Sequence, residues 1–418
     1  MNTDYIVIGA GLIGLSTAYA LLERGAGSVR ILERRAGAAL ETSFANAGMV
    51  HASLADPWNG PGVGRQLIGS VFDPASPMKL RLASLPGLSF WGLKFLKYSA
   101  PERHWNATKH NYFLADHSMQ KLAQWRDKLD IKDGYSLPGM MKIFRSLPEY
   151  ENAKSVVENL VGLGLEARYL SGKEAIEREP YLAPIAHKIK KAIYFPNDYK
   201  ANAYEFCQGL ALAIEKLGGH IEYEKTIQHI IHRDSKIIGV KTNTGDYFAK
   251  TTIVAAGPWS YQLLAPLGVG LSMRPVKGYS LTFDGVTGPQ IPVGDKSLHA
   301  AVTPLGNSVR IAGTAEFTGF NRALKQSRIA PLLSMLEQIY PDLAEGLSIE
   351  DGKWWCGFRP VSADGVPFIG MVKPGLAVNA GQGHMGWTLS AGSGDVLASI
   401  LCGEKPAINM EPFSPNRK

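Results

Sequence analysis

The chain opens with a hydrophobic pattern that predicts a strand, a helix and a second strand. Tyr5–Ile8 (YIVI) is a short apolar run of the kind that a buried parallel strand shows. Apolar residues then recur near helical spacing from Leu12 to Leu22, and Gly25 offers a stop. Val29–Glu33 (VRILE) reads as the next strand. A unit of this kind begins a doubly wound parallel sheet and predicts an α/β fold.

The rest of the chain alternates between helical and strand-like patterns without an internal repeat. Further helices are predicted within the stretch from about Leu85 to Asp130 and at Glu149–Leu163, Ser171–Glu179, Ala203–Leu217, Ser327–Ile339 and Leu389–Leu401. Further strands are predicted at Gly139–Phe144, Ile221–Glu224, Ile227–His232, Ile238–Thr242, Tyr247–Lys250, Thr252–Ala256, Tyr279–Phe283, Val309–Gly313 and Leu376–Asn379.

The elements that build the parallel sheet lie at the start, the middle and the end of the chain, with other material between them. A chain of 418 residues also exceeds what one compact core usually organises. We therefore expect a Rossmann-like nucleotide-binding domain from residues 1–84, 146–268 and 340–418. An interleaved α+β substrate domain, built on a mixed or antiparallel sheet, is expected from residues 85–145 and 269–339.

Composition narrows the class of protein. Apolar residues make up 45% and charged residues 19%, which is ordinary for a soluble globular protein. The net charge of +7 is modest for this length, and no basic run interleaved with aromatic residues predicts nucleic-acid binding. No window reaches the roughly 18 apolar residues of a membrane span. The nearest is Leu82–Tyr98, which glycine, proline and lysine interrupt.

The N-terminus and the cysteines point to a cytoplasmic protein. The chain enters its first strand by Tyr5 with no charged and apolar leader, so we expect no signal peptide. Cys207, Cys356 and Cys402 form no paired framework and lack metal-ligand spacing. We therefore expect a reducing compartment and no metal site.

A glycine motif follows the first strand and opens the first helix. Gly9-Ala10-Gly11-Leu12-Ile13-Gly14 matches G-x-G-x-x-G, in which the glycines permit a tight turn, close approach of a pyrophosphate and close helix packing. Glu33 ends the next strand and could accept hydrogen bonds from a ribose diol. This motif therefore predicts a binding site for a dinucleotide. Glu33 argues against a 2′-phosphate on the ribose of the dinucleotide, but the neighbouring Arg34 and Arg35 leave that alternative open.

A second motif, Glu41–Gly48 (ETSFANAG), combines hydroxyl groups, an amide and glycine. Such a segment could bond a second phosphate or a cofactor ring. By composition alone it is equally compatible with an ordinary Asn/Gly loop.

Four stretches together resemble the FAD-dependent D-amino acid oxidase and dehydrogenase superfamily, most closely the bacterial D-amino acid dehydrogenases of the small-subunit type. They are IVIGAGLIGLSTAYAL, ALETSFANAG, RPVKGYSLT and the C-terminal GFRPVSADGVPFIG…NAGQGHMGWTLSAGSG. They span nearly the whole chain in the family's order. The resemblance implies a Rossmann-like FAD-binding domain and non-covalent FAD. Some relatives attach flavin through a cysteine near the last motif, but Cys356 lies one position before the matching place, which Gly357 occupies.

The resemblance extends the set of expected cofactor contacts beyond the glycine motif. The loop and helix start at 381–388 would face the flavin pyrimidine, where helix amides stabilise negative charge. The predicted cofactor-binding residues are Gly9, Gly11, Leu12, Ile13, Gly14, Glu33, Arg34, Thr42, Ser43, Asn46, Ala47, Gly48, Ile227, Ala256, Gly257, Arg359, Gly383, His384, Met385, Gly386, Trp387 and Thr388.

Three residues are candidates for the reaction itself. The resemblance gives Arg359, in GFRP, the role of gripping a substrate carboxylate bidentately. Tyr279, in KGYS, is a second candidate for bonding that carboxylate or for lining the pocket. His51, like His384, could tune the protonation of a substrate amine or could be structural.

The implied activity is oxidation of a D-amino acid to a 2-oxo acid and ammonia by hydride transfer from Cα to flavin. D-proline or hydroxy-D-proline is an alternative substrate, and glycine or sarcosine oxidation is another. A nicotinamide dehydrogenase would leave ETSFANAG and the C-terminal block without a role. A non-catalytic flavin-binding subunit would have no use for Arg359. The resemblance also implies a quinone or other respiratory acceptor and peripheral contact with the inner face of the membrane.

Overall fold

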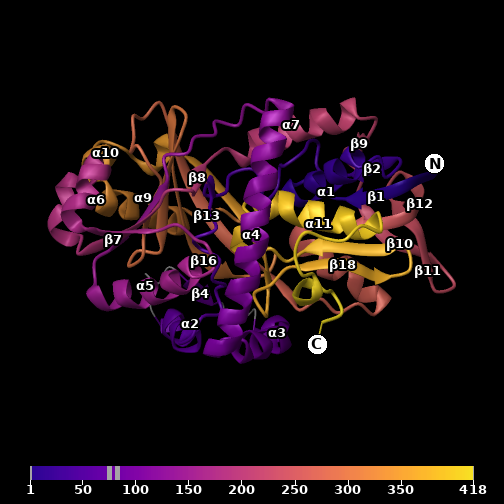
Figure 1. Ribbon diagram of the computed structural model, residues 1–418, viewed down its shortest axis with the longest axis horizontal. Coiled ribbons are helices and arrows are strands. Elements are labelled where there is room, and N and C mark those ends of the chain that lie inside the picture. The colour runs from indigo at the N-terminus through magenta and orange to yellow at the C-terminus, as the bar shows by residue number, and fades with distance from the viewer. Residues whose placement is uncertain (1, 73–77, 81–84, 418) are drawn as a thin grey trace.

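Two β-sheets lie side by side in the computed structural model, which describes residues 2–72, 78–80 and 85–417. The long helix α4 (Pro101–Leu129) runs between the two lobes in the view of Figure 1. The fold is a mixed α/β fold with one sheet mainly parallel and the other mainly antiparallel, as expected from the sequence.

The first sheet has a parallel centre. Its parallel strands are, in spatial order, β19 (Leu376–Ala380), β12 (Gly245–Val254), β1 (Asn2–Ile8), β2 (Val29–Leu32) and β9 (His220–Glu222). Antiparallel strands extend it, namely β10 (Ile227–Arg233), β11 (Lys236–Thr242) and β18 (Phe368–Lys373).

Strand β12 corrects one expectation. The sequence pattern predicts two strands, Tyr247–Lys250 and Thr252–Ala256, whereas the structure has one continuous strand. Its first residues pair with β11 and are exposed or half-buried, while Thr252–Val254 lie between β1 and β19 and are buried. The hydrophobic pattern therefore changes within the strand because its neighbours change.

The second sheet is larger and mixed. Its strands follow the order β17 (Lys353–Ser362), β13 (Met273–Asp284), β16 (Ser308–Phe317), β15 (Ala300–Leu305), β14 (Val293–Asp295), β5 (Met140–Phe144), β7 (Lys191–Phe195) and β6 (Arg168–Ser171), and β4 (Met78–Leu80) pairs with β16. Two short strands, β3 (Met49–Val50) and β8 (Tyr199–Lys200), pair separately.

The strands of this sheet differ from the expected division into domains. β6 and β7 fall in 146–268, and β17 falls in 340–418, ranges expected to build the nucleotide-binding domain. A short apolar run indicates a buried strand but does not indicate which sheet the strand joins. The hydrophobic pattern therefore could not assign β6, β7 and β17 to the second sheet. The expected boundary at residue 84 lies outside the described residues.

Helices cover the first sheet on one face. α1 (Leu12–Glu23) packs against α11 (Ser390–Leu401), and α11 packs against α4. A Cβ at Gly394 would lie 2.6 Å from the carbonyl carbon of Ser16, and one at Gly392 would lie 2.6 Å from the Cβ of Ser118. Both glycines therefore allow close packing of helices. They stand in the C-terminal glycine-rich motif, but they do not belong to its cofactor loop.

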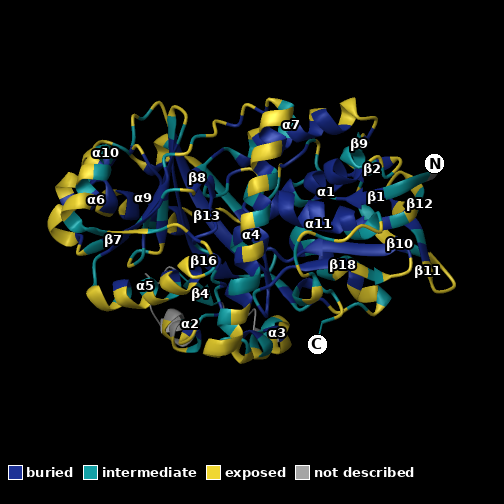
Figure 2. Cartoon of the chain, in the orientation of Figure 1, coloured by how far each residue is buried: buried dark blue, intermediate teal, exposed yellow. Residues whose placement is uncertain are grey.

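The remaining helices are distributed over both sheets. They are α2 (Val63–Phe72), α3 (Leu85–Lys97), α5 (Leu147–Val161), α6 (Gly172–Arg178), α7 (Ala203–Lys216), α8 (Ser260–Leu264), α9 (Gln326–Ile339) and α10 (Pro341–Ala344). Figure 2 shows buried strands enclosed by helices with exposed outer faces. Among the described residues, no helix has the length and apolar character needed to cross a membrane.

Candidate active site

A cavity of about 1320 Å³ is lined by residues of both sheets. At one end it meets the turn between β1 and α1, and at the other it meets β5, β14 and α5. Arg359 of β17 and Gly278 of β13 contribute to its wall in between. The cavity therefore joins the predicted dinucleotide site to the face of the second sheet.

The glycine turn is built as the sequence motif predicts. Gly9 has a φ of +106°, and a Cβ there would lie 2.8 Å from the carbonyl oxygen of Ala255. A Cβ at Gly14 would lie 1.9 Å from the carbonyl oxygen of Gly9, so Gly14 packs the turn rather than facing the cavity. Helix α1 starts at Leu12 without a side-chain cap, and its first turn lines the cavity. This arrangement suits a phosphate group.

The acidic residue after β2 is buried and already hydrogen-bonded. The Glu33 carboxylate accepts the backbone N–H of Ala10 at 2.7 Å and that of Arg35 at 2.8 Å. Because each carboxylate oxygen has a second lone pair, Glu33 can still accept a ribose hydroxyl from the cavity that it lines. Arg34 and Arg35 both pair with Glu41 at 2.6 Å, and Arg322 shares the same carboxylate, so Glu41 holds all three guanidinium groups beside it.

The loop 41–48 is fixed against the start of α1 and against the second sheet. Thr42 donates its hydroxyl to the carbonyl oxygen of Phe358 at 2.8 Å, and the Ser43 hydroxyl accepts the N–H of Leu12 at 3.1 Å. The carbonyl oxygen of Asn46 accepts a hydrogen bond from Arg310 at 2.9 Å. These bonds hold the loop along the cavity at the start of α1.

Most predicted site residues meet at this cavity. Those that line it are Gly9, Gly11, Leu12, Ile13, Glu33, Arg34, Thr42, Ser43, Asn46, Ala47, His51, Ile227, Ala256, Gly257, Tyr279, Arg359, Gly383, His384, Gly386 and Trp387.

Four predicted residues do not line it, and each has another structural reason. Gly14 packs the turn, and Gly48 adopts a φ of +70° beside Leu305. Met385 is buried in the core, and the Thr388 hydroxyl accepts the backbone N–H of His51 at 3.1 Å. Each of these residues therefore supports a segment that lines the cavity without facing the cavity itself.

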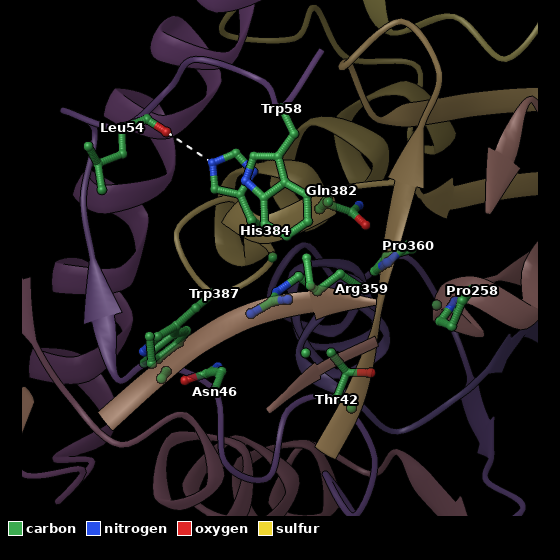
Figure 3. Close-up of a pocket in the computed structure, with 18 of the residues that line it drawn as sticks. Thr42, Asn46, Leu54, Trp58, Pro258, Arg359, Pro360, Gln382, His384 and Trp387 are labelled. Atoms are coloured by element: carbon green, nitrogen blue, oxygen red, sulfur yellow. Dashed lines mark hydrogen bonds between the residues drawn. The ribbon is translucent and has the colours of Figure 1, made fainter. Parts of the chain in front are cut away.

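Arg359 is the central cation of the site (Figure 3). Its Nη1 donates to the carbonyl oxygen of Thr314 at 3.3 Å, and its guanidinium lies over Gly278, where a Cβ would be 2.2 Å from Nη1. Within the described part of the chain, no carboxylate forms an ion pair with it. Burial lowers the pKa of Arg359 to about 10, so the group stays charged at neutral pH. An enclosed cation without a counter-ion is suited to binding a carboxylate.

Tyr279 lines the cavity, but its hydroxyl is engaged elsewhere. The hydroxyl donates to Glu316, and burial together with that carboxylate raises the pKa of Tyr279. A phenol whose proton is donated to Glu316 has none left for a substrate carboxylate. This geometry supports the lining role predicted for Tyr279 and argues against the carboxylate-binding one.

The two histidines are held neutral. Burial lowers the pKa of His51 to about 3 and that of His384 to about 4. The His384 ring stacks on Trp58 with centroids 5.4 Å apart, and its Nε2 lies 3.3 Å from the carbonyl oxygen of Leu54 (Figure 3). Neutral imidazoles at this position add no charge beside Arg359.

Sequence reasoning missed several lining residues. Trp58 stacks on His384 and lies 5.0 Å from the Arg359 guanidinium, but its turn carries no recognisable spacing. Lys142 lines the cavity from β5, and a lone lysine within the apolar run GMMKIF was the available signal. Thr314 has a φ of +56° at a bulge in β16, which no pattern would indicate.

The fold and the site define a flavin-dependent oxidoreductase, and comparisons with known proteins agree. The model of the family described as FAD dependent oxidoreductase matches residues 4–400. The chain belongs to this family, and its cofactor is FAD. The glycine turn, the helix start after Gly11 and the Glu33 carboxylate fit that dinucleotide.

Relatives are similar over nearly their whole length. A D-amino acid dehydrogenase of Azorhizobium caulinodans is 34% identical over 416 residues, 99% of each chain. One of Bradyrhizobium diazoefficiens is 33% identical, covering 99% of this chain and 98% of the relative. Among solved structures, glycine oxidase from Geobacillus kaustophilus has a TM-score of 0.75 at 25% identity, covering 100% of this chain and 99% of its own.

The cysteine next to the Arg359 motif points away from the cavity. Trp355, Gly357 and Arg359 line it, and alternation along β17 puts Cys356 on the other face. Its thiol lies 3.6 Å from the carbonyl oxygen of Arg322.

Proposed function

We propose that this protein oxidises a D-amino acid to the corresponding imino acid, which water converts to a 2-oxo acid and ammonia. The observation that carries the proposal is the Arg359 guanidinium, enclosed in the cofactor cavity without a carboxylate partner among the described residues. The relatives named D-amino acid dehydrogenase support the substrate class.

The chain's own residues bind and orient the substrate. Arg359 holds the α-carboxylate, and its contacts with Thr314 and Gly278 fix the direction in which Cα points. Bound FAD supplies the acceptor for the hydride that leaves Cα with two electrons. Enclosure of the substrate amine beside the buried His51 and His384 favours its neutral form. The nitrogen lone pair of that form makes the C=N bond as the hydride leaves.

The cofactor is proposed to be bound without a covalent link. Cys356 faces away from the cavity, and the other two cysteines do not line it. Heat or acid denaturation should therefore release FAD quantitatively into the supernatant, whereas a covalent link would leave the colour in the precipitate.

The proposed electron acceptor is a membrane quinone or another respiratory carrier. Helix α3 carries an exposed apolar face, with Phe90 87% and Leu93 69% accessible, while Trp91 and Phe95 anchor its other face. Lys94 and Lys97 lie in its last turn. Such a helix suits contact with an anionic membrane surface.

Glycine or sarcosine oxidation is the second candidate, favoured by the likeness to glycine oxidase. A secondary amine such as D-proline is a third substrate within the same chemistry. Both would use Arg359 in the same way, so only substrate comparison separates them.

The test is a product assay with enantiomer pairs. The purified holoenzyme is incubated with D- or L-alanine, D- or L-proline, glycine and sarcosine, with a short-chain quinone or oxygen as acceptor. Formation of 2-oxo acid and ammonia from the D-enantiomer, with quinone faster than oxygen, is the expected result. Turnover of L-enantiomers alone, or of glycine alone, would overturn the proposed substrate class.

A further inference from the structure

A second positively charged position lies in the same cavity, across the sheet from Arg359. Lys142 lines the cavity from β5, flanked by the apolar residues Met141 and Ile143 that face the opposite core. Among the described residues, its ammonium has no hydrogen bond or ion pair within 4 Å. The mechanism above makes no use of this buried charge.

The floor between the two cations consists of small residues. Lys142 pairs in register with Gly294, Gly294 with Ala301, and Ala301 with Ala312, and all four line the cavity. Register partners on neighbouring strands point to the same face of a sheet. This row of glycine and alanine leaves an open trough that leads from Lys142 to β16.

The separation of the two cations suits one small substrate. The Arg359 guanidinium contacts Thr314 of β16, and β5 lies three strand positions from β16. Three spacings amount to roughly 14 Å, and the lysine side chain reaches back over part of that distance. The charges of both Arg359 and Lys142 act on the His384 imidazole, which places them on the same part of the cavity.

Charged residues of both signs line this end of the cavity. Asp56 lines the cavity and interacts with Lys142 and Lys296, so one carboxylate faces two ammonium groups. Nearby Glu149 accepts a hydrogen bond from Ser297 at 2.6 Å, and Asp295 pairs with Arg145 at 2.7 Å. Glu149 keeps its negative charge, because a serine hydroxyl does not neutralise a carboxylate. Lys142, whose ammonium has no ion pair within 4 Å among the described residues, is the cation at this end that a ligand carboxylate can approach.

We infer that Lys142 forms a side-chain subsite that selects a D-amino acid with an anionic side chain, such as D-glutamate or D-aspartate. The inference rests on the proposed function, because it assumes that Arg359 holds the α-carboxylate. The substrate would then bridge the two cations, with its side chain in the trough over Gly294 and Ala301. Lys142 acts in this scheme on selection and positioning and takes no part in the transfer of hydride.

The test compares substrates of equal shape and different charge. The holoenzyme is assayed for kcat/KM on D-glutamate, D-glutamine and D-alanine, in the wild type and in K142M, K142R and the exposed control K173M. The wild type should prefer D-glutamate over D-glutamine by about tenfold or more, and K142M should abolish that ratio. K142R should keep most of the preference, and K173M should keep both the preference and the D-alanine turnover of the wild type.

The outcomes separate the two proposals. A wild type that oxidises D-alanine but shows no preference for D-glutamate, or a preference that survives in K142M, would overturn the role of Lys142 and leave the proposed function standing. An enzyme that oxidises no D-amino acid would overturn the proposed function itself. A K142M protein that does not fold is replaced by K142Q, for which the same loss of preference is expected.

Discussion

At the scale of single residues, the proposed function depends on the charge of Arg359, which is enclosed in the cavity without a carboxylate partner among the described residues. Arg359 keeps its charge beside Gly278 and Trp58, and among the described residues only the carbonyl oxygen of Thr314 accepts a hydrogen bond from it. Desolvating a guanidinium is costly unless a ligand or partner restores its hydrogen bonds. In the proposed function, a substrate carboxylate supplies those bonds.

Replacing Arg359 should therefore remove substrate binding while leaving the cofactor in place. R359M should lower kcat/KM for the best D-amino acid by about a hundredfold or more, and R359K by less, because lysine keeps the charge but not the bidentate geometry. The measurement is steady-state kinetics together with the flavin absorbance of each protein. R168M, at an exposed position, is the control and should behave as the wild type. Unchanged kcat/KM in R359M would remove Arg359 from the site.

A second residue-scale prediction concerns pH. Burial raises the pKa of Asp198 from 3.8 to about 7, against hydrogen bonds from Ser53 and the N–H of Ala52. A raised folded pKa means that the stabilising contribution is complete below about pH 4 and is lost as the pH rises through 7. The full shift corresponds to at most about 4 kcal/mol.

D198N should remove this dependence, since the amide keeps an acceptor for Ala52 and never ionises. Melting temperatures at pH 5 and pH 8 are expected to fall less with rising pH in D198N than in the wild type. D116N, at an exposed carboxylate, should follow the wild type. Parallel curves for D198N and the wild type would show that Asp198 does not titrate in this range.

At the scale of secondary-structure elements, the cofactor end of the cavity depends on close packing of helices. The Gly394 position of α11 lies against the backbone of Ser16 in α1, the helix whose first turn lines the cavity. Any side chain there separates the two helices, and with them the glycine turn.

G394A should therefore destabilise the protein by about 1–3 kcal/mol and weaken FAD binding. Urea unfolding and FAD titration of the apoprotein measure the two effects. G92A in α3, where a Cβ meets nothing within 4 Å, is the matched control and should be neutral or slightly stabilising. A stable G394A protein with unchanged FAD affinity would contradict this view of the α1–α11 contact.

Sequence patterns indicated the cofactor end of the site far better than its substrate end. The turn at Gly9 and the carboxylate of Glu33 follow from local spacing, because strand, turn and helix are contiguous. Lys142 and Arg359 lie on strands that are distant in sequence, and only the sheet order brings them to one cavity. The engagement of Tyr279 with Glu316 likewise depends on the pairing of β13 with β16.

At the scale of the whole molecule, one face combines apolar and basic groups. Phe90, Leu93 and Leu96 are exposed on α3, and Lys94 and Lys97 belong to the same helix. No helix in the described ranges has the length and apolar character to span a bilayer.

Vesicles should therefore bind this face. Wild-type protein is expected to co-sediment with vesicles containing anionic lipid, and a F90S/L93S double variant should lose most of that binding at unchanged activity with a soluble acceptor. L212S, which removes an exposed leucine elsewhere, is the control. Equal binding of all three proteins would place the contact on another face.

The most direct test of the central claim is the visible spectrum of the holoenzyme without oxygen, before and after a D-amino acid is added. The account predicts a yellow protein that bleaches with D-alanine or D-glutamate and stays yellow with the L-enantiomers, and an R359M variant that stays yellow with all of them. A holoprotein that no D-amino acid bleaches, or that bleaches equally in R359M, would contradict it.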